Sequence, residues 1–363
     1  MIKILKIVLI AILSIVTVFV LIVFRLYAIK IYDSVLQQSH MKKLEAYYED
    51  SYTPVDESQF VNFDRFDDET TLDEIQMLAS HNSYKKTGSD IGKFFIGLGD
   101  SFAEARALKY GYQNLTEQFE VGIRSMEFDL RKRKSSFVLT HVPLVDNSSV
   151  APDFAMALEE INLYSENNPT HIPIVILLEI KEDWMILDHA LQDISREELI
   201  ELDELLENKL GTHLYKPSDF MQDGLSIRET ILNHGWPTVT SLLGKVIFVL
   251  HPNNMNQAYL DIDSSLETQS MFIGSYADEL ETDYASFVVQ NEVDVNLISS
   301  LVSNQYIVRT RIDESLLFDQ DRMDEAIISG AQILTSDFTK GRKDLDQDEM
   351  ITLNNYTVIK RTT

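Results

Sequence analysis

The feature that most constrains the fold is a series of short apolar segments alternating with helix-like segments over roughly residues 75–340. Eight apolar segments are predicted strands: 75–80, 124–131, 136–141, 172–181, 245–251, 285–290, 305–310 and 331–338. Helical periodicity is clearest over 195–210 and 321–330, and Asn114 with Glu117 forms a predicted capping box. Nearly continuous apolar strands separated by helices indicate a largely parallel sheet covered on its outer face. The pattern therefore predicts a (β/α)8 barrel, in which active sites lie at the carboxyl ends of the strands.

The amino-terminal segment contains an apolar run long enough to cross a bilayer. Residues 7–24 form an uncharged run of 18 residues between Lys6 and Arg25, close to the length of a transmembrane helix. A cleaved secretory signal is the alternative, but its apolar region usually has about 7–15 residues and ends in a small-x-small site, which does not follow Phe24 well. We predict that residues 1–30 form an uncleaved signal anchor, a transmembrane helix ahead of the barrel.

The charges that flank this run give a small bias in orientation. Lys3, Lys6 and the α-amino group slightly outnumber Arg25 and Lys30, so the positive-inside rule favours a short internal tail and an external folded domain. We expect a single-pass, membrane-anchored protein with its folded domain outside the cell, the alternative being secretion after signal cleavage.

Three further segments follow the anchor. Residues 31–74 are acidic and lack a sustained apolar period, so they form either a stalk or an amino-terminal cover on the domain, and the sequence leaves both open. The barrel is expected over 75–340 and a carboxyl-terminal tail over 341–363. No sequence feature sets the oligomeric state, and the expected state is a monomer.

Composition excludes several classes of function. The chain has no cysteine, so disulfides, thiolate zinc sites and a cysteine nucleophile are excluded, and any metal must be held by oxygen or imidazole. The net charge of -27 argues against nucleic-acid binding, because nucleic-acid binders neutralise phosphates with clustered Lys and Arg. The same charge argues against electrostatic adsorption to anionic lipid.

Polar residues collect at the ends of the first three predicted strands. His81 and Asn82 follow the first strand, Glu127 and Asp129 lie two apart in the second, and His141 ends the third. Since side chains alternate along a strand, Glu127 and Asp129 share a face. Two carboxylates facing a dry core would be costly, and a bound cation removes that cost.

The fourth strand adds Glu179 and Lys181 at its end. Four oxygen donors can then meet at one end of the barrel: Asn82, Glu127, Asp129 and Glu179. Such an all-oxygen set suits a hard cation such as Ca²⁺ or Mg²⁺, and two nearby histidines provide acid-base groups for phosphoryl transfer. The alternative is a structural salt-bridge cluster of the two strand carboxylates with Arg124 and Arg131.

Four blocks in order, "SHNSY", "RSMEFDLR", "THVPL" and "LLEIK", resemble the Ca²⁺-dependent phosphoinositide-specific phospholipase C family in its compact single-domain form. The resemblance extends over roughly residues 75–340 and includes "HGWPTVTSLLGKVIFVL" and "AIISGAQILTSDF". It implies a barrel that cleaves phosphatidylinositol to diacylglycerol and an inositol cyclic phosphate. The implied Ca²⁺ ligands are Asn82, Glu127, Asp129 and Glu179.

The resemblance also implies roles for the remaining residues. Glu127 accepts the proton of the inositol 2-hydroxyl, His81 hydrogen bonds the phosphoryl oxygens, and His141 protonates the departing diacylglycerol oxygen. Lys181, Arg309 and Arg311 are weaker candidates for binding the headgroup phosphate. Because basic clusters are lacking, the expected substrate is phosphatidylinositol without further phosphates.

Two other functions stay open at this point. A glycerophosphodiester phosphodiesterase uses a similar barrel, but such enzymes typically have His-Arg and His-Asp where this chain has His81-Asn82 and His141-Val142. A catalytically silent, surface-anchored binding module is the other alternative, although no motif is broken. Residues 85–112 form a predicted insertion after the first strand, in which "FFIGLG" is either core or an apolar rim that dips into lipid.

Overall fold

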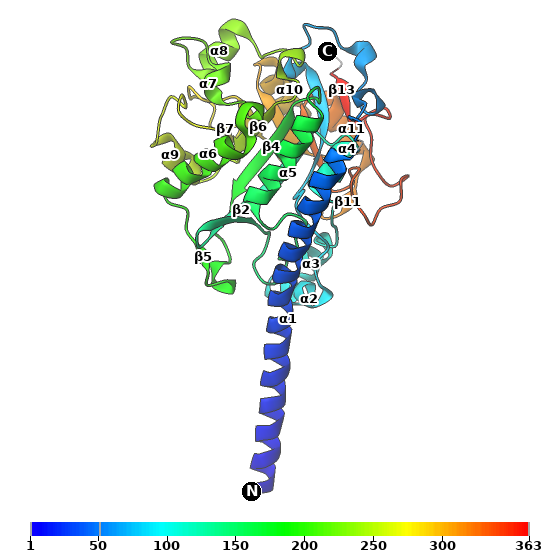
Figure 1. Cartoon of the computed structure of the whole chain (residues 1–363), viewed down its shortest axis with the longest axis vertical. Coiled ribbons are helices and arrows are strands. Elements are labelled where there is room, and N and C mark those ends of the chain that lie inside the picture. The colour runs from blue at the N-terminus through cyan, green and yellow to red at the C-terminus, as the bar shows by residue number, and fades with distance from the viewer. Residues whose placement is uncertain (1, 51, 362–363) are drawn as a thin grey trace.

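The computed structural model describes residues 2–50 and 52–361 of the chain. Parallel pairing of successive strands, closed by β1 against both β2 and β12, forms a barrel (Figure 1). Its strands are β1 (Ile75–Ser80), β2 (Ser125–Arg133), β4 (Ile174–Ile180), β6 (Val246–Leu250), β7 (Phe272–Ser275), β8 (Phe287–Val289), β9 (Ile307–Arg311) and β12 (Ile333–Ser336). The predicted (β/α)8 barrel is confirmed.

The remaining strands lie outside this closed ring. They are β3 (Ser136–Leu139), β5 (Leu191–Gln192), β10 (Asp313–Glu314), β11 (Leu317–Phe318) and β13 (Val358–Lys360). Both β3 and β5 pair antiparallel with β2, and β13 pairs antiparallel with β1. The segment 341–363, expected to be a tail, therefore contributes a strand to the sheet, and Val358 in it is fully buried.

Seven of the eight predicted strands belong to the barrel, and one does not. The segment 136–141 forms β3, which turns back on β2 as a hairpin, so its prediction as a barrel strand is wrong. The barrel strand that the sequence did not reveal is β7, which has four residues including Gly274. The apolar run there ends at Gly274, and a glycine within a strand pattern weakens the prediction of a strand.

Helices lie around the barrel and at its ends (Figure 1). They are α1 (Ile2–Glu49), α2 (Asp90–Gly99), α3 (Phe102–Ala107), α4 (Leu115–Glu120), α5 (Phe154–Asn167), α6 (Arg196–Leu210), α7 (Pro217–Phe220), α8 (Ile227–His234), α9 (Met255–Leu260), α10 (Val295–Ser303) and α11 (Gln320–Ser329). The helices predicted at 195–210 and 321–330 are α6 and α11. The capping box of Asn114 and Glu117 is present at the start of α4.

A single 48-residue helix, α1, joins the apolar amino terminus to the barrel. Its first half extends away from the domain (Figure 1), and side chains there from Ile4 to Phe24 are largely exposed. Its second half packs against α5, where Met41 and Leu44 are buried and Asp33 accepts a hydrogen bond from Lys86 at 2.7 Å. Residues 31–49 therefore cover one side of the barrel.

Candidate active site

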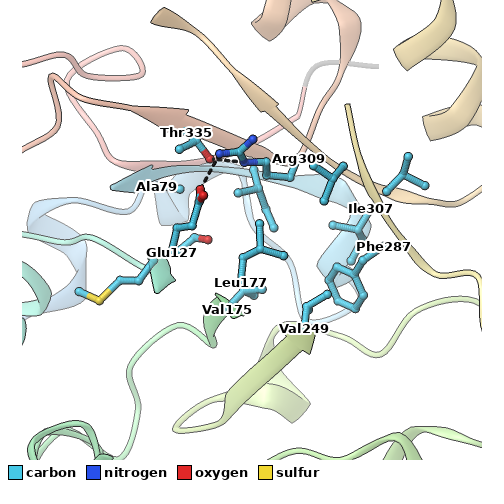
Figure 2. Close-up of a pocket in the computed structure, with 14 residues that line it drawn as sticks. Ala79, Glu127, Val175, Leu177, Val249, Phe287, Ile307, Arg309 and Thr335 are labelled. Atoms are coloured by element: carbon cyan, nitrogen blue, oxygen red, sulfur yellow. Dashed lines mark hydrogen bonds and ion pairs between the residues drawn. The ribbon is translucent and has the colours of Figure 1, made fainter. Parts of the chain in front are cut away.

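A buried ion pair lies at the carboxyl end of the barrel, between β2 and β9. Arg309 donates from Nη2 to Glu127 Oε2 at 2.5 Å and from Nε to Thr335 Oγ1 at 2.9 Å. Figure 2 shows these side chains pointing toward one another at one edge of an apolar cluster. That cluster includes Val175, Leu177, Val249, Phe287 and Ile307. The barrel interior is therefore packed core, and the polar chemistry is confined to its mouth.

The ion pair fixes the protonation state of Glu127. Burial alone would raise the pKa of this carboxyl group, but the positive charge of Arg309, followed by that of His81, holds the pKa well below its usual range. Glu127 is therefore a carboxylate at any physiological pH.

His81 follows β1 and is oriented by a buried carboxylate. Its Nδ1 lies 2.9 Å from Asp337 Oδ1 and 3.1 Å from the Tyr110 hydroxyl, and its Nε2 lies 4.0 Å from Glu127 Oε1. Burial would raise the pKa of Asp337, but the charges of His81 and Arg311 lower it. The ionised Asp337 therefore favours the proton on Nδ1 and turns Nε2 toward Glu127.

Asn82 lies in the left-handed backbone region, with φ 48°. Asparagine tolerates this conformation better than most residues. Its Nδ2 donates to the Tyr110 hydroxyl at 3.1 Å, and its side-chain carbonyl accepts no hydrogen bond from the described residues. That oxygen is available to a ligand.

Asp129 and Glu179 are direct neighbours on β2 and β4. Lys181 Nζ lies 2.7 Å from Glu179 Oε1 and 4.0 Å from Asp129 Oδ1, while Tyr84 donates its hydroxyl to Asp129 Oδ2 at 2.9 Å. Burial raises the pKa of Asp129, although the charge of Lys181 opposes this. Burial would lower the pKa of Lys181, but the two carboxylates raise it. Lys181 therefore acts as the counter-ion of the pair.

His141 lies in the loop after β3, two residues beyond the strand end at Leu139. The expectation that it ends a barrel strand is wrong, because β3 is the returning arm of a hairpin. Its Nδ1 lies 3.1 Å from Asp146 Oδ2, and Lys85 Nζ lies 3.3 Å from the other oxygen. Burial would raise the pKa of Asp146, but Lys85 and His141 lower it. His141 is therefore oriented by a carboxylate, as His81 is.

The three basic residues predicted to bind phosphate differ in availability. Arg309 is buried and donates from each of its three nitrogens, to Thr335, Asn291 and Glu127. Arg311 makes one longer contact of 3.4 Å with Asp337, and its buried Nε has no hydrogen-bond partner among the described residues. Of the two arginines, Arg311 has the donor capacity left for an anion.

Sequence reasoning missed the partners that orient the site. Asp337 directly follows β12, so the same strand-end argument that selected His81 could have found it. Asp146, five residues after His141, and Tyr110 lie in loops, where residue spacing gives no such signal.

No group of three His, Asp or Glu residues within 2–50 and 52–361 is preassembled as a metal cluster. The donor chemistry nevertheless fits Ca²⁺, since amide and carboxylate oxygens meet at one end of the barrel with no thiolate among them. Lys181 and Arg309 neutralise these carboxylates in this arrangement, and a divalent cation would compete with Lys181 for Glu179 and Asp129.

The fold and the site together define a barrel enzyme with paired carboxylates and two carboxylate-oriented histidines, suited to phosphodiester chemistry. A family model described as "Phosphoinositide phospholipase C, Ca2+-dependent" matches residues 131–362. The chain belongs to this Ca²⁺-dependent phosphoinositide phospholipase C family. This membership favours a phospholipase over a glycerophosphodiester phosphodiesterase or a silent binding module.

Two solved structures show the same fold. The apo Ca²⁺-dependent phosphoinositol-specific phospholipase C from Pseudomonas sp. has a TM-score of 0.61 and 16% identity, covering 84% of this chain and 99% of that one. The Ca²⁺-dependent phosphatidylinositol-specific enzyme from Streptomyces antibioticus has a TM-score of 0.53 and 18% identity, covering 74% and 95%. No curated protein matches the sequence.

Replacing Asp337 by Asn should reduce catalysis without unfolding the protein. The amide keeps a hydrogen bond to His81 but removes the charge that favours its protonated Nδ1, so we expect kcat for phosphatidylinositol hydrolysis to fall at least about tenfold with little change in KM. The control is Asp67→Asn, whose carboxylate is exposed and pairs with Lys360. Steady-state kinetics and melting temperatures test this, and wild-type kcat in Asp337→Asn would contradict the positioning role.

Proposed function

We propose that this enzyme cleaves phosphatidylinositol between phosphate and glycerol, releasing diacylglycerol and an inositol 1,2-cyclic phosphate. The observation that carries the proposal is the pair of histidines at the barrel mouth. His81 is oriented by buried Asp337 and lies beside Glu127, while His141 is oriented by buried Asp146. Two imidazoles positioned in this way can act in one phosphoryl transfer, one on the phosphoryl oxygens and the other as the acid for the leaving group.

In this proposal, Ca²⁺ is held by Asn82, Glu127, Asp129 and Glu179. When bound, the ion supplies positive charge that acidifies the inositol 2-hydroxyl and stabilises charge developing on the phosphate. Two observations support this assignment. The side-chain carbonyl of Asn82 accepts no hydrogen bond from the described residues. The neighbouring carboxylates of Asp129 and Glu179 already share the positive charge of Lys181.

Glu127 is the proposed acceptor of the hydroxyl proton. It is ionised and therefore able to accept a proton, but Arg309 makes it a weak base. Proton transfer then depends on how strongly the site acidifies the hydroxyl. This assigns Arg309 a positioning role, and leaves Lys181 and Arg311 as the candidates for contacting the substrate phosphate.

His81 is proposed to act as an imidazolium that donates from Nδ1 to Asp337 and from Nε2 to the phosphoryl oxygens. His141 is proposed to protonate the departing glycerol oxygen. We further propose that the inositol ring carries no additional phosphates. Each basic residue at the mouth already faces a carboxylate, so little positive charge is left for a multiply charged headgroup.

Calcium should be required for activity and should raise the melting temperature of the protein. With phosphatidylinositol vesicles, we expect cyclic phosphate release in Ca²⁺ and none in excess chelator, and a higher melting temperature with Ca²⁺, since binding stabilises the folded state. Asn82→Leu removes a ligand and should raise the Ca²⁺ needed for half-maximal activity by about tenfold or more.

The matched control is Asn162→Leu in α5, whose side chain donates to Glu166 at 2.9 Å. Full wild-type activity in excess chelator would refute the calcium assignment.

The two histidines should respond differently to an activated leaving group. His81→Ala and His141→Ala should each lower turnover of phosphatidylinositol by at least about 10²-fold. An aryl ester of inositol phosphate, whose leaving group needs no proton, should restore the rate of His141→Ala but not that of His81→Ala. His189→Ala, at an exposed position, is the control, and equal rescue of both variants would overturn these roles.

We propose that residues 1–30 remain attached as a single-pass anchor, with the barrel outside the cell and the protein monomeric. One described helix is long and apolar enough to cross a membrane. Its continuity with the packed half of α1 supports retention over cleavage, because Asn147 donates to Leu26 O at 3.1 Å and Tyr27 accepts from Arg133 at 2.8 Å.

Deleting residues 1–18 tests the anchor. The shortened chain keeps residues 19–49, and its remaining apolar run, 19–24, is too short to span a bilayer. We therefore expect a folded, soluble enzyme that hydrolyses a short-chain, water-soluble phosphatidylinositol at the full-length rate. On dilute vesicles its activity should be lost, because anchoring supplies a high effective concentration of lipid. Full-length protein that sodium carbonate extracts from membranes would contradict the anchor.

A further inference from the structure

A groove of about 460 Å³ lies between the anchor helix and the rim of the barrel. One wall is formed by Phe19, Val23 and Leu26 of α1, and the opposite walls by α2, α3 and the loops after β3 and β4. Figure 1 shows α2 and α3 beside α1 where α1 leaves the barrel. An edge contact between the rings of Phe19 and Phe95, with centroids 6.5 Å apart, joins the helix to this rim.

His141 is one of the residues that line this groove. In the proposed function, His141 delivers a proton to the glycerol oxygen of the departing diacylglycerol. The leaving group must therefore lie within reach of His141, and so beside the groove that this residue lines.

The lining of the groove suits a neutral, apolar ligand. Eleven of its sixteen lining residues are apolar, and neither Lys nor Arg occurs among them in the described part of the chain. Its charged residues besides His141 are acidic, and Asp100 and Glu104 among them are exposed. Such a lining disfavours the anionic headgroup and accommodates diacylglycerol, which has no charge.

We infer that this groove binds the glycerol and upper acyl chains of the lipid, so that the membrane anchor forms one wall of the substrate site. The inference rests on the proposed function, because it takes diacylglycerol as the leaving group. The chain segment that fixes the enzyme to the bilayer then also contacts the lipid that is cleaved, and diacylglycerol leaves along α1.

Filling the groove should make the enzyme discriminate against long acyl chains. Gly99, at the end of α2, lines the groove, and a Cβ added there meets no heavy atom within 4 Å. Full-length Gly99→Trp and wild type are compared on dioleoyl-phosphatidylinositol in mixed micelles and on dihexanoyl-phosphatidylinositol in solution. We expect the ratio of long-chain to short-chain kcat/KM to fall about tenfold, because acyl contacts in the groove contribute to transition-state binding.

Leu98→Trp is the matched control, since Leu98 neighbours Gly99, is 62% exposed and does not line the groove. An unchanged ratio in Gly99→Trp, or an equal fall in both variants, would overturn the groove assignment. Wild type that hydrolyses neither lipid would instead overturn the proposed function, and the inference with it.

A second measurement does not depend on any variant. Wild-type full-length protein in detergent is irradiated with a diazirine-labelled diacylglycerol, and the labelled peptides are mapped by mass spectrometry. Adducts at residues 19–26 and 142–145 would support the groove. Adducts confined to residues 4–18, the bare part of α1, would refute it.

Discussion

Charge compensation at the mouth of the barrel is the constraint on which the site depends. Acidic side chains from β2, β4 and the end of β12 meet where the apolar interior stops, and each is close to a basic side chain. Glu127 faces Arg309, Glu179 faces Lys181, and Asp337 faces both His81 and Arg311. Without such partners, buried carboxylates would either take up protons or destabilise the fold.

The ion pairs at the mouth differ in how tightly their basic side chains are held. Arg309 is enclosed and donates two further hydrogen bonds, to Thr335 and Asn291, so its pairing with Glu127 is part of the scaffold. Lys181, by contrast, is partly exposed, and in the proposed calcium site the ion would take its place beside Glu179 and Asp129. The same mouth can thus be stable before it binds an ion and still present oxygen ligands to one.

The sequence predicted the barrel because long apolar strands repeat with helices between them, and it placed His81, Glu127 and Glu179 near one another because parallel strands end on one side. The sequence-based prediction failed for elements whose place in the fold is not encoded in the local residue pattern. A hairpin arm and a barrel strand have the same alternation, so β3 was misplaced. Gly274 interrupts the apolar run of β7, so this strand was missed. Asp146 depends on a loop that brings it back to His141, which only tertiary packing sets.

The uninterrupted course of α1 has a mechanical consequence. No break separates its bare half from the half packed on α5, so no flexible linker joins the barrel to the proposed anchor. Within a bilayer, any tilt of the helix would become an equal tilt of the catalytic mouth. Such an enzyme would search for substrate by lateral diffusion in two dimensions, and its rate would follow the mole fraction of lipid in one leaflet and not its bulk concentration.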